Sequence, residues 1–182
     1  MDKTRSLSSF VIRPVSLKDA GELLAIYAPY VERSHISFEY EVPALSEYEE
    51  RINKVTETYP WFIAEMDGKI IGFAYASKFR ERAAYGWALE SSIYVLDSHQ
   101  GSPSSCAKVL YETLFEALKK QGIKQVLGVI SLPNDKSVRF HEKMGFQTVG
   151  KFQSVGYKFN QWWDVLFMTK FLEELPFSPP LL

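Results

Sequence analysis

The chain has 182 residues, of which 46% are hydrophobic and 24% charged, and these proportions fit one globular domain with one core. Its formal net charge of −1 argues against a nucleic-acid or anionic-membrane partner, because both favour a basic face. No apolar run approaches the roughly 20 residues of a membrane helix. Residues 1–10 do not resemble a signal peptide, and the only cysteine, Cys106, leaves no intrachain disulfide. We therefore expect a cytoplasmic protein.

The N-terminal part is expected to hold one strand followed by two helices. Residues 10–13 form the strand. Ser16 then opens a helix with Asp19 as its capping-box partner, and the apolar face of this helix consists of Leu23, Leu24, Tyr27 and Val31. A second helix is expected near Ser46, where Glu49 repeats the capping spacing, and its apolar stripe is Tyr48, Ile52 and Val55.

The rest of the chain predicts strands that are first consecutive and then separated by helices. Strands are expected at 61–66, 70–79 and 87–96, the first two joined by an Asp67-Gly68 hairpin turn. A helix over 105–121 ends at Gly122 and precedes a strand at 124–130. Asn134 or Asp135 caps a helix that ends at Gly145, and two strands follow at 146–153 and 162–170. This order predicts an α/β domain over about residues 10–172, with a mixed sheet, helices on both sides and a loose tail at 173–182.

The segment between the 87–96 strand and the next helix has the composition of a phosphate-binding loop. It runs Gln100-Gly101-Ser102-Pro103-Ser104-Ser105-Cys106-Ala107. Backbone N–H groups and the dipole at a helix N-terminus both favour an anion there. Taken alone, a Ser/Pro/Gly stretch before a helix is more often a plain loop with a cap.

Several further segments, in collinear order over about residues 10–170, carry a more specific signal. The chain resembles the GNAT N-acetyltransferases, and within them the phosphinothricin and methionine sulfoximine acetyltransferases. The matching segments are Tyr59-Pro60-Trp61, Ala64-Glu65, Asp67-Gly68, Gly72-Phe73-Ala74-Tyr75-Ala76, Ala88-Leu89-Glu90-Ser91-Ser92-Ile93-Tyr94-Val95, His99-Gln100, Leu132-Pro133-Asn134-Asp135, Ser137-Val138-Arg139, His141-Glu142, Met144-Gly145-Phe146, and Gly156-Tyr157-Lys158-Phe159 with Trp162 and Asp164.

This resemblance implies a GNAT acyl-CoA N-acyltransferase fold, with a mixed sheet of about seven strands flanked by about four helices. It implies acetyl-CoA as the acyl donor, bound in a splay between the fourth and fifth strands, and a small-molecule amine as the acceptor. It also implies a homodimer, for which Trp162 and Trp163 are candidate interface residues because aromatic side chains are enriched at such contacts.

The resemblance further implies a set of cofactor-binding residues. The family's pyrophosphate loop reads Gln/Arg-x-x-Gly-x-Gly/Ala; here Ala107 matches its last small residue, but Ser105 replaces the first glycine and the usual Arg or Lys is missing. A Cβ at Ser105 can obstruct the approach of a backbone to phosphate. The candidates are Ile93, Tyr94, Val95, Gln100, Gly101, Ser102, Ser104, Ser105, Cys106, Ala107, Asn134 and Ser137. Asn134 is also a candidate helix N-cap.

Two residues are candidates for the catalytic chemistry. Glu90 matches a glutamate of the related enzymes and is placed to take a proton from the substrate ammonium or to hold it; its structural alternative is a pair with a buried arginine or the backbone. Tyr111 is a candidate donor to the departing thiolate, and at its helical spacing equally a core residue. His35, His99 and His141 lack metal-ligand spacing, and His141 is expected to be structural. Cys106 is expected to be a small buried residue, although a helix start can lower a thiol pKa.

Four residues are candidates for the acceptor site. Arg80 and Arg82 follow the 70–79 strand, and arginine suits bidentate capture of a carboxylate or phosphinate; solvated surface arginine is the alternative. Phe38 and Phe79 are expected to wall the pocket or to pack in the core. The departures in the 101–107 loop keep a second function open, namely a non-catalytic acyl-CoA-binding or regulatory protein of the same fold.

Overall fold

The computed structural model describes residues 10–99 and 106–174. Helical and extended segments follow each other in the order that the sequence predicts. The strands are β1 (Val11–Pro14), β2 (Trp61–Met66), β3 (Lys69–Lys78), β4 (Ala88–Val95), β5 (Gln125–Leu132), β6 (Gln147–Lys158) and β7 (Gln161–Phe171). The α-helices are α1 (Ala20–Glu32), α2 (Leu45–Thr56), α3 (Cys106–Lys120) and α4 (Asp135–Lys143), and the 3-10 turns are η1 (Leu17–Asp19), η2 (Ala83–Tyr85) and η3 (Asp97–His99).

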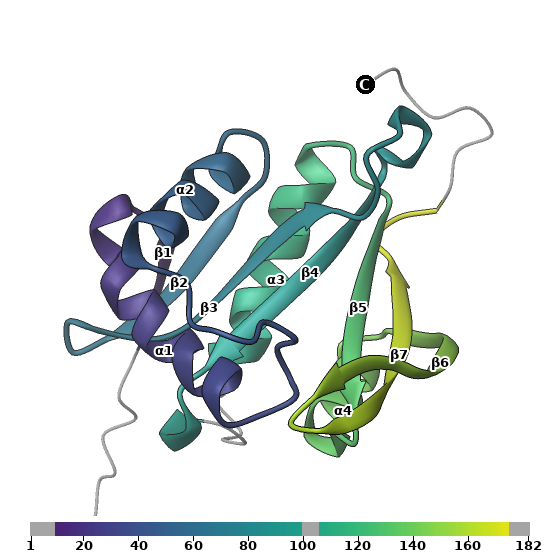
Figure 1. The fold of residues 1–182 in the computed structure, drawn as a ribbon. Helices are drawn as coiled ribbons and strands as arrows, with labels where there is room; N and C mark the ends of the chain where they lie inside the picture. Colours follow the sequence, from purple (N-terminus) through teal and green to yellow (C-terminus); the bar gives the residue numbers. More distant parts are fainter. Residues whose placement is uncertain (1–9, 100–105, 175–182) are drawn as a thin grey trace, which may run out of the picture.

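The seven strands form one sheet in the order β1-β2-β3-β4-β5-β7-β6 (Figure 1). Neighbouring strands are antiparallel, with the exception of β4 and β5, which are parallel. The crossover between these two strands is α3. The expected mixed sheet of seven strands with four helices is therefore confirmed.

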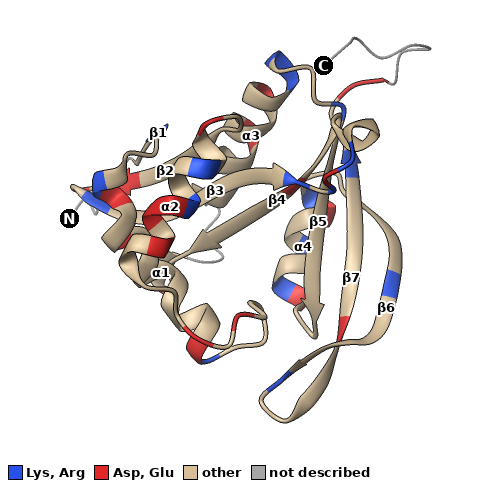
Figure 2. Cartoon of the chain, turned by 45° about the horizontal axis from the view of Figure 1, so that its top comes forward, with Lys and Arg blue, Asp and Glu red and all other residues tan. Residues whose placement is uncertain are grey.

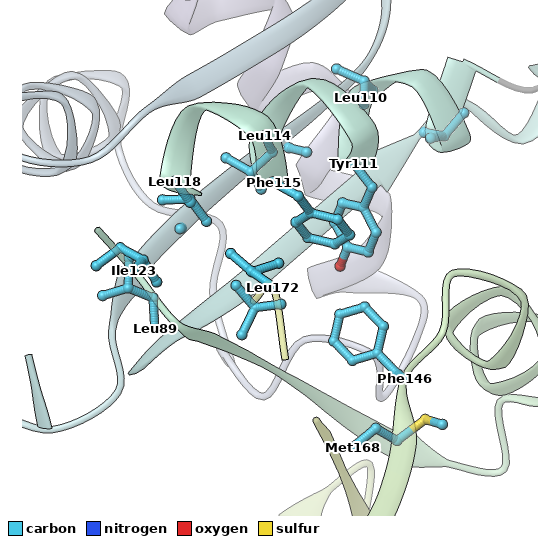
Figure 3. Packing of buried hydrophobic residues seen from close by; sticks show 14 of the residues in the cluster. Leu89, Leu110, Tyr111, Leu114, Phe115, Leu118, Ile123, Phe146, Met168 and Leu172 are labelled. Carbon is cyan, nitrogen blue, oxygen red and sulfur yellow. The ribbon is translucent and has the colours of Figure 1, made fainter. Parts of the chain in front are cut away.

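Two hydrophobic clusters fill the two faces of the sheet. On one face, α1 and α2 pack over Trp61, Ile63 and Phe73. On the other face, the expected stripe of α3, Leu110, Leu114 and Leu118, is fully buried against β3, β4 and β5. Figure 3 shows this second cluster, with the rings of Tyr111 and Phe115 pointing from α3 toward Phe146. Alternate residues of β4 thus belong to opposite faces, as the period of a strand requires.

The helix caps agree with the sequence prediction at one site and differ at the other. Ser16 and Asp19 form the expected capping box, although the box opens the 3-10 turn η1, and α1 follows it. The expected Ser46 and Glu49 cap of α2 is wrong. The helix begins one residue earlier, at Leu45, and the backbone N–H of Ala44 donates to Glu47 at 3.0 Å. The capping spacing of three residues is present, but it joins Ala44, whose backbone is extended, to Glu47 and not Ser46 to Glu49.

Strand β6 is longer than the sequence predicts. It was expected to end at residue 153, but it continues to Lys158 and turns into β7 through Phe159 and Asn160, both of which have positive φ. Register shifts between Thr148 and Gly150 and between Phe152 and Gly156 interrupt its pairing with β7. Such bulges break the alternation of buried and exposed residues by which a strand is recognised.

Charged side chains are spread over the helices and strands. Figure 2 shows lysine and arginine intermixed with acidic residues rather than gathered on one broad face. Within the part of the chain that the structure describes, no helix has the length and apolar character needed to cross a bilayer.

Candidate active site

The parallel pair of β4 and β5 is joined along only part of its length. The paired positions are Ala88 with Gln125, Leu89 with Val126 and Glu90 with Leu127. Beyond Glu90, β4 continues to pair with β3 as far as Val95, and β5 continues to pair with β7 as far as Leu132. The two strands therefore separate after Glu90, and the expected splay between the fourth and fifth strands is confirmed.

The register shows which backbone groups of β4 point into this splay. Leu96 N–H donates to the carbonyl of Ile71 at 3.0 Å, so residues of the same parity pair with β3, and Ile93 and Val95 point toward β5. The Val95 carbonyl accepts a hydrogen bond from the Tyr30 hydroxyl at 2.6 Å. One acceptor position of the Val95 carbonyl is therefore taken by a side chain of α1. Ile93 is the inner position of the splay.

A serine side chain marks the point where the strands part. Ser91 is buried, and its hydroxyl donates to the carbonyl of Leu127 at 3.1 Å. The same oxygen lies 3.4 Å from the hydroxyl of Tyr111. A side-chain bond therefore continues the link between β4 and β5 for one residue beyond the last backbone pair.

Tyr111 and His141 form a buried hydrogen-bonded pair next to Ser91, on the α3 face of the sheet. Nδ1 of His141 lies 2.8 Å from the carbonyl of Ser137, so it carries the proton and donates. Burial lowers the pKa of His141, and its neutral Nε2 then accepts from the Tyr111 hydroxyl at 3.1 Å. Burial also raises the pKa of Tyr111. The structure therefore supports the core alternative for Tyr111 and the structural assignment of His141.

Glu90 lies on the opposite face of β4 from Ser91, toward α1 and α2. Burial raises the pKa of its carboxyl, and the charge of Arg80 opposes this effect. Its strand neighbours are Ser77 on β3 and Leu127 on β5. The carboxylate thus stands at the last paired position of the splay, half-buried and near one cation, and a raised pKa suits a group that exchanges protons near neutral pH.

The expected acceptor-site residues occupy two different places. Arg80 and Phe79 follow β3, with the guanidinium 4.9 Å from the centre of the Phe79 ring, and this ring meets Tyr85 edge to face at 5.8 Å. Arg82 is exposed at the N-cap of η2. Phe38 lies elsewhere, in the segment of chain that joins α1 to α2. Its ring packs against β6 and fills the space that a Cβ on Gly156 would need. Of the two arginines, Arg80 is the one whose charge acts on Glu90.

The expected cofactor-binding residues are placed as follows. The backbone of Ile93 and Val95 faces the splay, while the side chain of Tyr94 packs against Tyr27 and Tyr30 on the other side. Asn134 is the N-cap of α4 and accepts from Ser137 N–H at 3.2 Å. Gln100, Gly101, Ser102, Ser104 and Ser105 lie outside the described residues.

Cys106 and Ala107 form the first turn of α3. Cys106 is buried, and burial raises the pKa of its thiol to about 11. Burial thus outweighs the lowering effect of the helix start on the thiol pKa, and Cys106 is the small buried residue that the sequence analysis expects. Among residues 10–99 and 106–174, no three His, Cys, Asp or Glu side chains gather as a metal site requires.

Comparison with known proteins agrees with this geometry. The model of the acetyltransferase (GNAT) domain family matches residues 12–167. The phosphinothricin N-acetyltransferase of Streptomyces viridochromogenes is 37% identical over 93% of this chain and 90% of its own length. The chain belongs to the GNAT acetyltransferase family.

Two further relatives resemble this GNAT acetyltransferase. An L-methionine sulfoximine/L-methionine sulfone acetyltransferase of Pseudomonas aeruginosa is 27% identical over 92% of this chain and 98% of its own. The crystal structure of a phosphinothricin acetyltransferase from Sinorhizobium meliloti, in complex with acetyl-CoA, superposes with a TM-score of 0.84. It is 29% identical and covers 89% of this chain and 88% of its own.

Sequence reasoning proposed Phe38 as a pocket residue but missed the other contacts that residues 33–44 make with the sheet. His35 in this segment stacks on Trp163 of β7, with ring centres 3.8 Å apart, and its Nδ1 lies 2.6 Å from the hydroxyl of Ser131 on β5. Glu39 pairs with Arg51 of α2 at 2.7 Å. The segment has neither helical nor strand periodicity, so no local signal indicates that it crosses the sheet.

Proposed function

We propose that this GNAT acetyltransferase moves the acetyl group of acetyl-CoA to the amino group of a small amino acid or a related analogue, of the phosphinothricin or methionine sulfoximine kind. The observation that carries the proposal is Glu90, a half-buried carboxyl with a raised pKa at the closed end of the β4–β5 splay. The relatives named above act on such substrates and are matched over most of their length.

The residues present fit acetyl-CoA. The splay offers the backbone of Ile93 at an unpaired stretch of β4, directed toward β5. Asn134 caps α4 through its carbonyl oxygen, which leaves the amide NH₂ as a donor toward the pantetheine arm, with Ser137 beside it. Cys106 and Ala107 begin α3, whose N-terminal dipole favours the pyrophosphate. When bound, acetyl-CoA supplies an activated thioester.

In this proposal, Glu90 holds the substrate ammonium and accepts its proton, directly or through water, so that the amine becomes nucleophilic. Arg80 lies close enough to influence the Glu90 pKa and remains exposed. Its guanidinium is therefore assigned to the carboxylate of the acceptor, for which a planar pair of donors is well suited. A cation and a carboxylate side by side match the two charges of an α-amino acid.

The test is acetyl-CoA calorimetry followed by a thiol-release assay over a panel of amines that includes phosphinothricin, methionine sulfoximine, methionine sulfone and simple amines without a carboxylate. The proposal expects binding, and turnover that is fastest with the amino-acid analogues. Binding without thiol release across the panel would instead support an acyl-CoA-binding regulatory protein. Faster turnover with amines that lack a carboxylate would reject the assignment of Arg80.

We also propose that the protein is a homodimer. Strands β6 and β7 carry a row of exposed apolar side chains, among them Val149, Phe152, Val155 and Trp162, and aromatic residues of this kind are enriched at subunit contacts. Trp163 is instead half-buried and donates to the carbonyl of Lys158 at 2.9 Å, so Trp162 is the better candidate of the two indoles. A monomeric mass by light scattering at working concentration would reject the dimer.

A further inference from the structure

Lys158, the last residue of β6, has its ammonium group buried among backbone carbonyls. The residue is 2% exposed. Its Nζ donates to the carbonyls of Val31 at 2.6 Å, Ser34 at 3.0 Å and Ser37 at 2.7 Å. One of these carbonyls belongs to the last turn of α1 and the other two to the segment that follows. An ammonium has three donors that point in different directions, and here each donor has one acceptor.

The carbonyls belong to the α1–α2 loop (residues 33–44) and the helix end that precedes it. Two further contacts join this loop to β6. The ring of Phe38 lies against Gly156, where a Cβ would clash with it, and the hydroxyl of Tyr40 donates to the carbonyl of Tyr157 at 2.6 Å. Three consecutive residues of β6 thus contact the loop or the helix end before it, and two of the three Lys158 bonds are buried.

The α1–α2 loop lies across the open end of the splay on the face that bears Glu90. His35 bonds to Ser131 of β5, and Ser131 points to the same face as Leu127, the partner of Glu90. Just before the loop, Tyr30 bonds to Val95 of β4. Figure 1 shows the loop running from α1 past β4 toward β5 and β7 before it returns to α2. The loop therefore bridges both strands of the splay, opposite the face covered by α3.

We propose that Lys158 is a positioning residue for the acceptor amine: it fixes the α1–α2 loop as a wall of the acceptor site without touching the substrate. This inference rests on the proposed function, which places the amine beside Glu90 on this face. The bound form of the amine needs a preformed wall, because a displacement of the order of 1 Å in a positioning element can lower the rate about 10²-fold. Within the described residues, the hydrogen bonds of Lys158 go to Val31, Ser34 and Ser37 and not to α3, on the other face of the sheet.

The experiment compares Lys158→Met with Lys151→Met. Both substitutions remove an ammonium from β6, but the Lys151 side chain is 43% exposed and forms a surface ion pair with Asp164 of the neighbouring strand at 3.0 Å. The measurements are KM for the acceptor amine, KM and calorimetric affinity for acetyl-CoA, and hydrogen exchange of residues 33–44. Lys158→Met is expected to raise the amine KM about tenfold or more and to speed exchange in the loop, while acetyl-CoA affinity stays within about twofold. Lys151→Met is expected to leave all of these values near those of the parent.

An unchanged amine KM and unchanged loop exchange in a folded Lys158→Met protein would overturn the proposal, and so would an equal loss of acetyl-CoA affinity. If Lys158→Met does not fold, Lys158→Arg decides. A guanidinium keeps the charge, but its planar donors do not match three separate carbonyls, so the same selective rise in amine KM is expected and its absence would reject the role. Loop exchange and acetyl-CoA calorimetry can be measured without turnover. A protein that acetylates none of the amines would therefore reject the proposed function, while these two measurements would still test the role of Lys158.

Discussion

The hydroxyl of Ser91 donates to the carbonyl of Leu127 at 3.1 Å, directly beyond the last backbone pair of β4 and β5. This part-buried bond joins the two strands at the point where the splay opens. The same hydroxyl borders the Tyr111–His141 pair, so side chains on the α3 side add to the strand pairing at the closed end of the splay.

Ser91→Ala is expected to lower the free energy of unfolding by about 0.5–1.5 kcal/mol, because it removes a part-buried hydrogen bond to the Leu127 carbonyl. Ser98→Ala is the matched control. Ser98 is exposed, and its hydroxyl lies 2.9 Å from Nδ1 of the neighbouring His99, so a change within about 0.5 kcal/mol is expected. Urea denaturation of both variants measures the difference, and equal stabilities would show that the Ser91 bond contributes nothing.

Glu90→Gln is expected to lower kcat by roughly 10²–10⁴-fold, the range for loss of a general base. Because burial raises the Glu90 pKa, the parent rate should fall with decreasing pH already above the range of an ordinary carboxyl, as the base becomes protonated. The variant should lack this acid limb, and higher pH should partly restore its rate by supplying free amine. Glu81→Gln, at a side chain 87% exposed, is the control; a parent-like profile in Glu90→Gln would remove Glu90 from the mechanism.

Arg80→Met is expected to shift the acid limb of the pH–rate profile to higher pH. The guanidinium lowers the Glu90 pKa, so its removal lets this pKa rise further and the base is protonated over a wider range. KM for a carboxylate-bearing amine should rise as well, since Arg80 is assigned to that group. Arg82→Met carries the same change two residues along, and the assignment fails if Arg82→Met rather than Arg80→Met produces these effects.

Gly156→Ala is expected to destabilise the fold by about 1–3 kcal/mol, the usual cost of forcing extra volume into a packed contact. A Cβ there meets the ring of Phe38, whereas a Cβ at Gly150 on the same strand meets nothing within 4 Å. Gly150→Ala should therefore be close to neutral. Thermal melts compare the two variants, and a Gly156→Ala protein as stable as Gly150→Ala would mean that Phe38 moves aside without cost.

The parts of this protein that local periodicity encodes were predictable. Leu110, Leu114 and Leu118 repeat at helical spacing and form the buried stripe of α3, and Asp67-Gly68 makes the expected turn between β2 and β3, both residues having positive φ. The Phe159 and Asn160 turn was missed, because phenylalanine is not a usual residue at positive φ. The bulges of β6 hid its continuation to Lys158.

Some residues of the candidate site were also predictable from the sequence, whereas the contacts between distant segments were not. Glu90 and Arg80 were proposed from a resemblance carried by short segments, and the structure brings their charges close together. The contacts of Lys158 with Val31, Ser34 and Ser37 join positions more than 120 residues apart, and no single-chain pattern encodes such pairs. The hydrogen bond from the Tyr30 hydroxyl to the Val95 carbonyl was missed for the same reason, because it depends on how α1 packs on the sheet.

The early end of the β4–β5 pairing has a consequence for the protein before any ligand is bound. Beyond Ser91, β4 stays paired with β3 but is not paired with β5 in the described chain, and on that side the Val95 carbonyl is bonded to the Tyr30 side chain instead of to a strand. Unpaired strand edges recruit other extended chains and are a common origin of aggregation. A ligand that hydrogen-bonds along β4 acts as a missing strand, so acetyl-CoA should protect the protein against aggregation as well as serve as its acyl donor.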